Sequence, residues 1–203
     1  EFTQLDIEMS FIDDEDILGM MEDMTVQMFK EGIDADIKAP FKRLTYAEAM
    51  DKYGSDKPDL RFEMELVNLS EAVKGSDFKV FESVIQSGGE VKAINVKNYA
   101  NIARRELDGL VDYVGIYGAK GLAWIQYTEE GIKSPITKFF SEEIINNITA
   151  TTKAETGDLI LIIADKPAVV AQSLGELRLE MARRLNLIDE DKLSFLWVVD
   201  FPM

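Results

Sequence analysis

Hydrophobic and polar residues alternate strictly at the start of the chain, in the sequence EFTQLDIEMSF of residues 1–11. Leu5, Ile7, Met9 and Phe11 fall on one side of the alternation, and polar side chains fall on the other. A period of two is typical of a half-buried strand, because successive side chains leave opposite faces of a sheet. We therefore predict a strand whose polar face is either solvated or part of a site. It begins at residue 1 without a start signal, so we expect a piece of a longer protein.

A helical period of 3.6 residues is visible in other parts of the chain. Four acidic residues at 13–16, the TYAE sequence at 45–48 and Ser141 are suitable N-terminal caps. The first helix has a methionine stripe, which we interpret as core packing; an adaptable binding groove is the alternative. Helices are predicted over residues 14–31, 46–53, 101–117, 142–152 and 167–187.

Short apolar runs predict strands in the rest of the chain. The run DLILII at residues 158–163 is the most apolar, and it predicts a buried central strand. The sequence SGGE at 87–90 predicts a hairpin turn; it lacks the downstream glycine and lysine of a phosphate-binding loop. The two terminal strands are expected to share a second sheet. Strands are predicted over residues 1–11, 78–85, 91–96, 122–127, 158–163 and 194–199.

These elements predict an α+β fold in which one domain is inserted into another. Residues 67–191 would form a two-layer α/β domain, an antiparallel sheet with helices on one face. Residues 1–66 and 192–203 would belong to the domain that is interrupted. The sequence SDKPDLRF at 55–62 lies just before the boundary, and it is dense in charge. It is either a surface turn or a loop that holds ion pairs near a site.

Composition narrows the possible functions of the 203 residues. Apolar residues make up 46% and charged residues 30%, as in a globular protein, and the net charge of −16 argues against nucleic-acid binding by the overall field. The sequence contains no cysteine and no histidine, which excludes disulfides, thiolate metal sites, imidazole bases and nearly every zinc site. No run is apolar enough to span a bilayer and no signal peptide opens the chain, so we expect a cytoplasmic protein.

One stretch departs from the acidic average. Between Lys74 and Arg105 there are six basic residues and three acidic ones. This excess indicates a surface with its own partner, for which Lys92, Lys97 and Arg104 are the candidate contacts.

Several motifs, in their order along the chain, resemble one family. EFTQLDIEMSF at 1–11 is similar to the distal strand of motif 2 in class II aminoacyl-tRNA synthetases of the aspartyl type. YGSDKPDLRF at 53–62 and FLWVVDFPM at 195–203 resemble the flanks of the insertion in the bacterial-type enzymes. IYGAKGLAW, SPITKFF, GDLILIIADK and LGELRLEMARRL resemble their inserted GAD domain, which is also found in amidotransferases that act on mischarged aminoacyl-tRNA.

The resemblance implies a fold, an activity and site residues. The parent protein would be a homodimeric aspartate–tRNA ligase that uses ATP and Mg²⁺ to activate aspartate and then aspartylates tRNA. Phe2 matches the phenylalanine that stacks on adenine, Asp6 the carboxylate that faces the α-ammonium of aspartate, and Gln4 lies beside it. In a strand, Gln4 and Asp6 would lie on one face about 7 Å apart. Lys92, Lys97 and Arg104 of the inserted domain are the candidate contacts with tRNA. No metal ligand is assigned to these residues.

The resemblance also implies limits. The motif 2 arginine, motif 1, motif 3 and the anticodon-binding barrel lie outside the 203 residues, so the chain alone is expected to be inactive and to hold no bound cofactor. Without the barrel, the sequence does not distinguish a ligase for tRNA(Asp) from one that also charges tRNA(Asn). The alternative is a stand-alone accessory module of the GAD type that binds tRNA or a partner protein.

Overall fold

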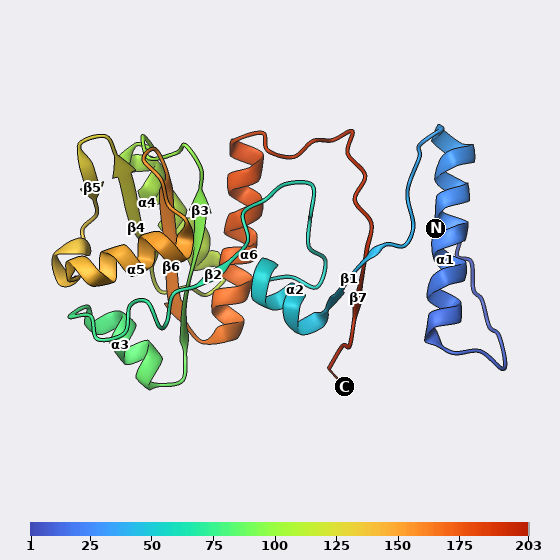
Figure 1. Ribbon diagram of the computed structural model, residues 1–203, viewed down its shortest axis with the longest axis horizontal. Coiled ribbons are helices and arrows are strands. Elements are labelled where there is room, and N and C mark those ends of the chain that lie inside the picture. Colours follow the sequence, from blue (N-terminus) through green and yellow to red (C-terminus); the bar gives the residue numbers. More distant parts are fainter. Residues whose placement is uncertain (203) are drawn as a thin grey trace. The chain divides into compact units, whose positions relative to one another are not determined.

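The computed structural model describes residues 1–202; Met203, the last residue of the FLWVVDFPM motif, lies outside the described residues. The chain divides into two compact units, the first of residues 1–43 and 195–197 and the second of residues 44–194 and 198–203. We describe each unit by itself. Figure 1 labels the helices and strands.

The first unit is built around helix α1 (Asp14–Ile33). The side chain of Asp13 accepts hydrogen bonds from the backbone N–H groups of Glu15 and Asp16, which satisfies two amides that the first helical turn leaves free. The ring of Phe195 packs edge-on against Phe29 of the helix, with 5.0 Å between centroids. The predicted helix of residues 14–31 is therefore confirmed, with two further residues at its end.

A buried carboxylate also connects parts of the first unit. Glu22 of α1 is 5% exposed and accepts hydrogen bonds from the backbone N–H of Phe41 and from Nε1 of Trp197. The methionines of α1 are less buried than the predicted core packing requires, since Met28 is 57% exposed. Strands β1 (Lys42–Thr45) and β7 (Leu196–Val199) form a two-stranded sheet, and they continue from this unit into the second.

The second unit contains a five-stranded antiparallel sheet in the order β2-β3-β6-β4-β5. Strand β6 lies at its centre, as the apolar run predicts, and pairs with β3 over seven residues from Glu90↔Asp165 to Val96↔Leu159. The strands are β2 (Val67–Asn68), β3 (Glu90–Val96), β4 (Ala123–Thr128), β5 (Gly131–Lys133) and β6 (Leu159–Asp165).

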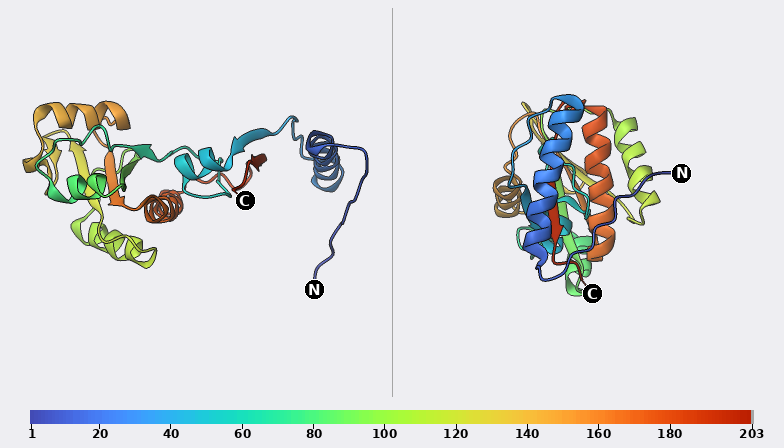
Figure 2. Two further views of the ribbon diagram at one scale, coloured as in Figure 1. Left: turned by 90° about the horizontal axis from the view of Figure 1, so that it is seen from below. Right: turned by 90° about the vertical axis from the view of Figure 1, so that its right-hand side faces the viewer.

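Helices cover both faces of this sheet, as the left view of Figure 2 shows, with α5 on one side and α4 and α6 on the other. Alternation along β6 explains this: Leu159, Leu161 and Ile163 face one core, and Ile160 and Ile162 face the other. The helices are α2 (Tyr46–Tyr53), α3 (Lys79–Gln86), α4 (Arg104–Ile116), α5 (Glu142–Thr152) and α6 (Pro167–Arg184), with a 3₁₀ turn at Thr137–Phe139.

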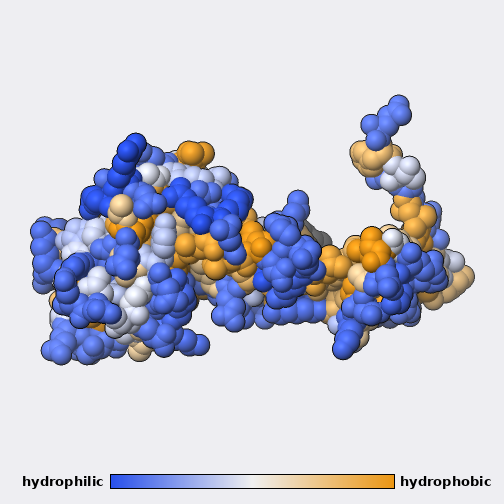
Figure 3. Space-filling view, turned by 90° about the horizontal axis from the view of Figure 1, so that it is seen from above, coloured by the Kyte–Doolittle hydropathy of each residue, from blue (hydrophilic) through white to orange (hydrophobic). Residues whose placement is uncertain are grey.

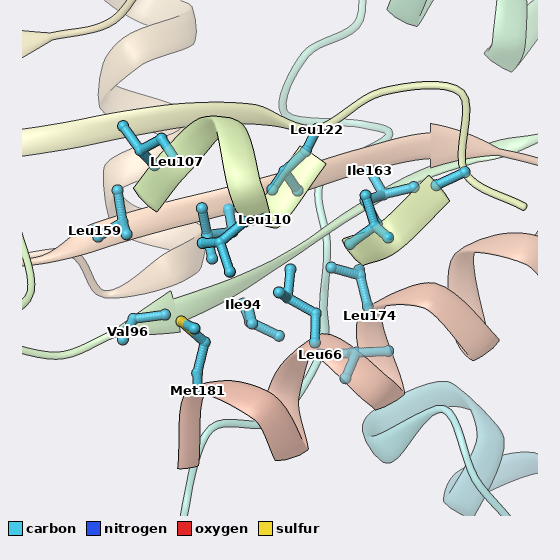
Figure 4. Packing of buried hydrophobic residues seen from close by; sticks show 14 of the residues in the cluster. Leu66, Ile94, Val96, Leu107, Leu110, Leu122, Leu159, Ile163, Leu174 and Met181 are labelled. Carbon is cyan, nitrogen blue, oxygen red and sulfur yellow. The ribbon is translucent and has the colours of Figure 1, made fainter. Parts of the chain in front are cut away.

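The first core lies between the sheet and helices α4 and α6. Leu107 and Leu110 of α4 and Leu174 and Met181 of α6 pack on the strand side chains and are at most 2% exposed (Figure 4). The second core contains Phe81 of α3 and, from α5, Ile144 and Ile148. The α+β class and the antiparallel sheet are thus confirmed, whereas the expected placement of all helices on one face is wrong.

Residues 78–85 form most of helix α3 and not the predicted strand. The prediction followed Phe78, Val80 and Val84 at a period of two. The buried positions follow a period near 3.6 instead: Phe81 is 2% exposed and Val80 is 54% exposed. The Ser87–Glu90 sequence consequently joins a helix to β3, so it is not a hairpin turn, and the backbone N–H of Gly89 bonds to the carbonyl of Val84.

The predicted strand over residues 1–11 is also absent from the structure. These residues pair with no strand among residues 1–202, and Leu5 and Met9 are 70% and 50% exposed. A strand requires a partner for its backbone N–H and C=O groups, which an alternating sequence cannot provide by itself. The two terminal segments therefore do not share a sheet as expected. Strand β7 pairs instead with β1, a strand that the sequence did not predict.

Candidate functional site

The three residues predicted to contact aspartate and ATP lie in the exposed segment of residues 1–11. Phe2 is 86% exposed, and Gln4 and Asp6 are exposed as well. None of the three forms a hydrogen bond or an ion pair with another residue in the range 1–202. Figure 3 shows hydrophobic and hydrophilic side chains mixed along this segment. The structure does not bring them together in a pocket, so their roles stay predictions.

The charged loop at residues 55–62 is held by contacts within the second unit. Asp59 receives hydrogen bonds from Nε and Nη2 of Arg61, at 3.1 and 2.8 Å. This fork of guanidinium donors lowers the pKa of the Asp59 carboxyl, and the same contact raises the pKa of Arg61. Arg61 also pairs with Glu190 at 3.2 Å, and Lys192 donates to the carbonyl of Arg61. This ion pair and this hydrogen bond therefore connect residues 59–61 with residues 190–192.

Arg178 of helix α6 lies beneath the same loop and is 1% exposed. Its Nε donates to the carbonyl of Met64 at 2.8 Å, and Nη2 donates to the carbonyl of Asp59 at 2.9 Å. The guanidinium also lies 3.9 Å from the ring centroid of Phe62. Burial lowers the pKa of Arg178 to about 10, so the side chain stays charged at neutral pH. Sequence reasoning did not identify this residue, because nothing local distinguishes it from the other arginines of the helix.

The predicted basic residues do not form one surface. The ammonium of Lys92 is buried and lies 2.6 Å from Oδ1 of Asp51 and 3.7 Å from Oε2 of Glu90. Lys92 is only 3% exposed, so its predicted contact with tRNA is not carried into the proposals below. Burial raises the pKa of Glu90, although Lys92 acts in the opposite direction.

Lys97 and Arg104 are more accessible than Lys92. Lys97 is half exposed and bonds to Asp158 at 2.8 Å, and Arg104 pairs with Asp108 at 3.0 Å while lying over the ring of Trp124. Asp158 is almost completely buried. Burial opposes its ionisation, but hydrogen bonds from Lys97 and from the backbone N–H groups of Glu155 and Asn98 outweigh this effect and lower its pKa.

Two further features bear on ligands. An open cavity of about 580 Å³ lies beside α3, with mostly apolar walls and with Lys120 and Lys166 among its lining residues. Within residues 1–202, no three or more His, Cys, Asp or Glu side chains are grouped so that they could hold a metal ion. No helix in the described part of the chain is long and apolar enough to cross a membrane.

Comparison with known proteins relates the chain first to a domain family and then to longer proteins. Residues 81–174, which lie within the second unit, match the model of the GAD domain family. Over its full length, the chain is similar to segments of bacterial aspartate–tRNA ligases.

Three curated relatives illustrate this similarity, and each match includes all of this chain. The aspartate–tRNA(Asp/Asn) ligase of Heliobacterium modesticaldum is 60% identical over 203 residues, which are 34% of that protein. The aspartate–tRNA ligase of Staphylococcus saprophyticus is 54% identical and is covered to 35%, and the aspartate–tRNA(Asp/Asn) ligase of Bacillus cereus is 55% identical and is covered to 34%. The chain thus spans about a third of the length of these relatives.

Proposed function

We propose that the protein to which these residues belong is an aspartate–tRNA ligase of class II. It would activate aspartate with ATP and Mg²⁺, form aspartyl adenylate, release pyrophosphate and then transfer the aspartyl group to tRNA. The observation that carries this proposal is the similarity of the whole chain, at 52–60% identity, to proteins named as such ligases. A cytoplasmic homodimer is proposed on the same basis.

Asp6 is proposed to bind the α-ammonium of aspartate, with Gln4 beside it and Phe2 stacked on the adenine of ATP. An ammonium that leaves water for a pocket requires an anionic acceptor, and charge-assisted hydrogen bonds are the strong ones. All three residues have even numbers, so in an extended strand they would lie in one row on one face. Within residues 1–202, all three side chains are exposed to solvent.

The reaction would depend on positioning and charge stabilisation, not on a histidine base. We propose that the 203 residues alone do not form the adenylate, because the arginines of motifs 2 and 3 lie elsewhere in the family. The test is aspartate-dependent exchange between pyrophosphate and ATP, measured for the whole ligase and for the isolated chain. Exchange by the whole ligase with aspartate, and no exchange above a blank by the isolated chain, is the expected result. Exchange by the isolated chain would contradict its proposed inactivity.

Contacts between the GAD domain and tRNA are proposed for Lys97 and Arg104, the two accessible residues among the three predicted candidates. Replacing both with glutamate in the whole ligase should weaken tRNA binding and reduce its dependence on salt, since fewer phosphate charges would be neutralised. Lys92→Met is the control, because its ammonium is buried. Unchanged tRNA affinity of the double variant at low salt would remove this proposal.

A further inference from the structure

Arg178 has an unusual set of partners for a buried arginine. All of its hydrogen bonds end on main-chain carbonyl oxygens: those of Asp59, Phe62, Glu63 and Met64, at 2.8–3.4 Å. An ion pair usually compensates a charge that is removed from water. Here, main-chain carbonyls and aromatic ring faces make the direct contacts, while the carboxylates of Asp59 and Glu65 act on the charge from a longer distance. The side chain thus contacts several residues of one loop through their backbone, and among residues 1–202 it forms no direct ion pair.

The planar fork of the guanidinium explains why an arginine suits this position. It carries five N–H donors in a fixed arrangement, so one side chain can reach carbonyls from several successive residues. Its flat face lies 3.9 Å from the ring centroid of Phe62 and 5.1 Å from that of Tyr53. Such contacts with aromatic rings stabilise a cation most where water is excluded. A lysine would keep the charge but could not span the same acceptors.

The same helix contacts the start of the loop through its backbone. A Cβ atom on Gly54 would lie 2.1 Å from the carbonyl oxygen of Ala171, and Gly54 itself has a φ of +68°. At the other end of the segment of residues 54–66, Leu66 donates its backbone N–H to the carbonyl of Lys52 at 2.7 Å. Helix α6 therefore contacts the segment between α2 and β2 at its beginning and along residues 59–64.

We propose that Arg178 is a positioning residue that fixes residues 54–66 against the GAD domain, and that the ligase reaction depends on this fixation. The segment connects helix α2, which precedes the domain, with the first strand of its sheet. It is bound again from the return segment by Glu190 and Lys192 through Arg61. Helix α6 thus holds the entering segment directly, and the return segment is held to the same place through Arg61. The second part of this proposal, that the reaction depends on the fixation, rests on the proposed function. The first part, that Arg178 fixes residues 54–66, does not.

The first measurement is amide hydrogen exchange in the 203-residue chain. Arg178→Met keeps the length of the side chain and removes the donors, leaving four carbonyls without this partner. Loss of hydrogen bonds from a buried charged group should accelerate exchange at the Leu66 amide by about tenfold or more. Arg183→Met is the matched control, because Arg183 lies on the same helix with its side chain 56% exposed. Exchange of the β6 amides should be unchanged in both variants.

The second measurement is aspartate-dependent pyrophosphate exchange by the whole ligase, at a temperature where each variant is fully folded. Arg178→Met should lower kcat by about tenfold or more, as expected for a displaced site, with a smaller change in the KM for ATP. Arg178→Lys should restore only part of either effect, and it replaces Arg178→Met if that variant does not fold. Arg183→Met should match the wild type.

The outcomes separate the two proposals. Equal rates of amide hydrogen exchange at Leu66 in Arg178→Met and in Arg183→Met would overturn the proposal that Arg178 fixes residues 54–66. Faster exchange at Leu66 with unchanged kcat would overturn its importance for the reaction. No activity of the wild-type ligase would reject the proposed function, while the exchange measurement would still decide whether Arg178 fixes the loop.

Discussion

Two glycines, Gly54 and Gly175, allow the backbones of α6 and the end of α2 to come into contact. A Cβ atom on Gly175 would lie 2.9 Å from the carbonyl oxygen of Gly54 and 2.9 Å from that of Tyr53. Both neighbours are backbone atoms, which cannot move as a flexible side chain does. The packing of α6 on the end of α2 therefore requires residues without a side chain at this point.

Gly175→Ala is predicted to destabilise the chain in spite of the better helix propensity of alanine. The methyl group would displace backbone, at a cost of about 1–3 kcal/mol, which exceeds the gain of about 0.5–1 kcal/mol for replacing a helical glycine. Urea unfolding with fluorescence detection measures the difference. Gly109→Ala in α4 is the control, because nothing lies within 4 Å of its Cβ position, and it should stabilise the chain. Stabilisation by both substitutions would contradict the close contact.

The helical assignment of residues 79–86 gives a second prediction. Phe81→Ala should lower the free energy of unfolding by about 3–5 kcal/mol, since a fully buried phenylalanine is truncated. Val80→Ala should change it by less than about 0.5 kcal/mol, because that side chain is largely exposed. In the alternating strand that the sequence suggested, Val80 would share the buried face with Phe78. A larger loss of unfolding free energy for Val80→Ala than for Phe81→Ala would therefore contradict the helix and favour the predicted strand.

Asp158 should contribute to the loss of stability in acid. Its pKa in the folded state is lower than the ordinary value of an aspartate. Its stabilising effect is therefore fully present above the unfolded-state pKa and is lost as the pH falls through the folded-state pKa. Asp158→Asn should cost about 1.5–3 kcal/mol at neutral pH, where charge-assisted hydrogen bonds are lost.

Urea unfolding over a series of pH values checks this assignment. The difference in stability between the wild type and Asp158→Asn should shrink as the pH becomes strongly acidic. Asp108→Asn is a suitable control, because its carboxylate forms an exposed pair with Arg104 and should contribute little at any pH. A difference between the wild type and Asp158→Asn that does not vary with pH would show that the asparagine acts through packing and not through charge.

The sequence correctly predicted the features that depend only on residues close together in the chain. The capping boxes at Asp13 and Thr45 are formed as their sequences suggest, and the most apolar run is the central strand β6. The errors arose where distant residues decide the structure. Phe81 is buried because the sheet and the ring of Phe140 lie against it, and residues 1–11 form no strand because an alternating pattern does not provide a partner.

The candidate functional residues show the same difference between what nearby residues determine and what distant residues determine. A resemblance of motifs could assign Asp6 a role, since the order of residues carries that information. It could not show that Lys92 is buried beside Asp51, 41 positions away, or that Arg178 binds carbonyls up to 119 positions away. Charge along a sequence does not determine which charges are buried, because burial depends on contacts formed only in the folded chain.

The proposed role of Asp6 is tested most directly by aspartate-dependent pyrophosphate exchange in the whole ligase. Asp6→Asn is compared with Glu8→Gln, which removes a nearby carboxylate of the same parity. Loss of one charge-assisted hydrogen bond to the substrate ammonium should lower kcat/KM for aspartate by about ten- to hundredfold. Glu8→Gln should stay within about twofold of the wild type, as an exposed substitution does. Equal activity of Asp6→Asn and the wild type would contradict the assignment of this segment to the aspartate site.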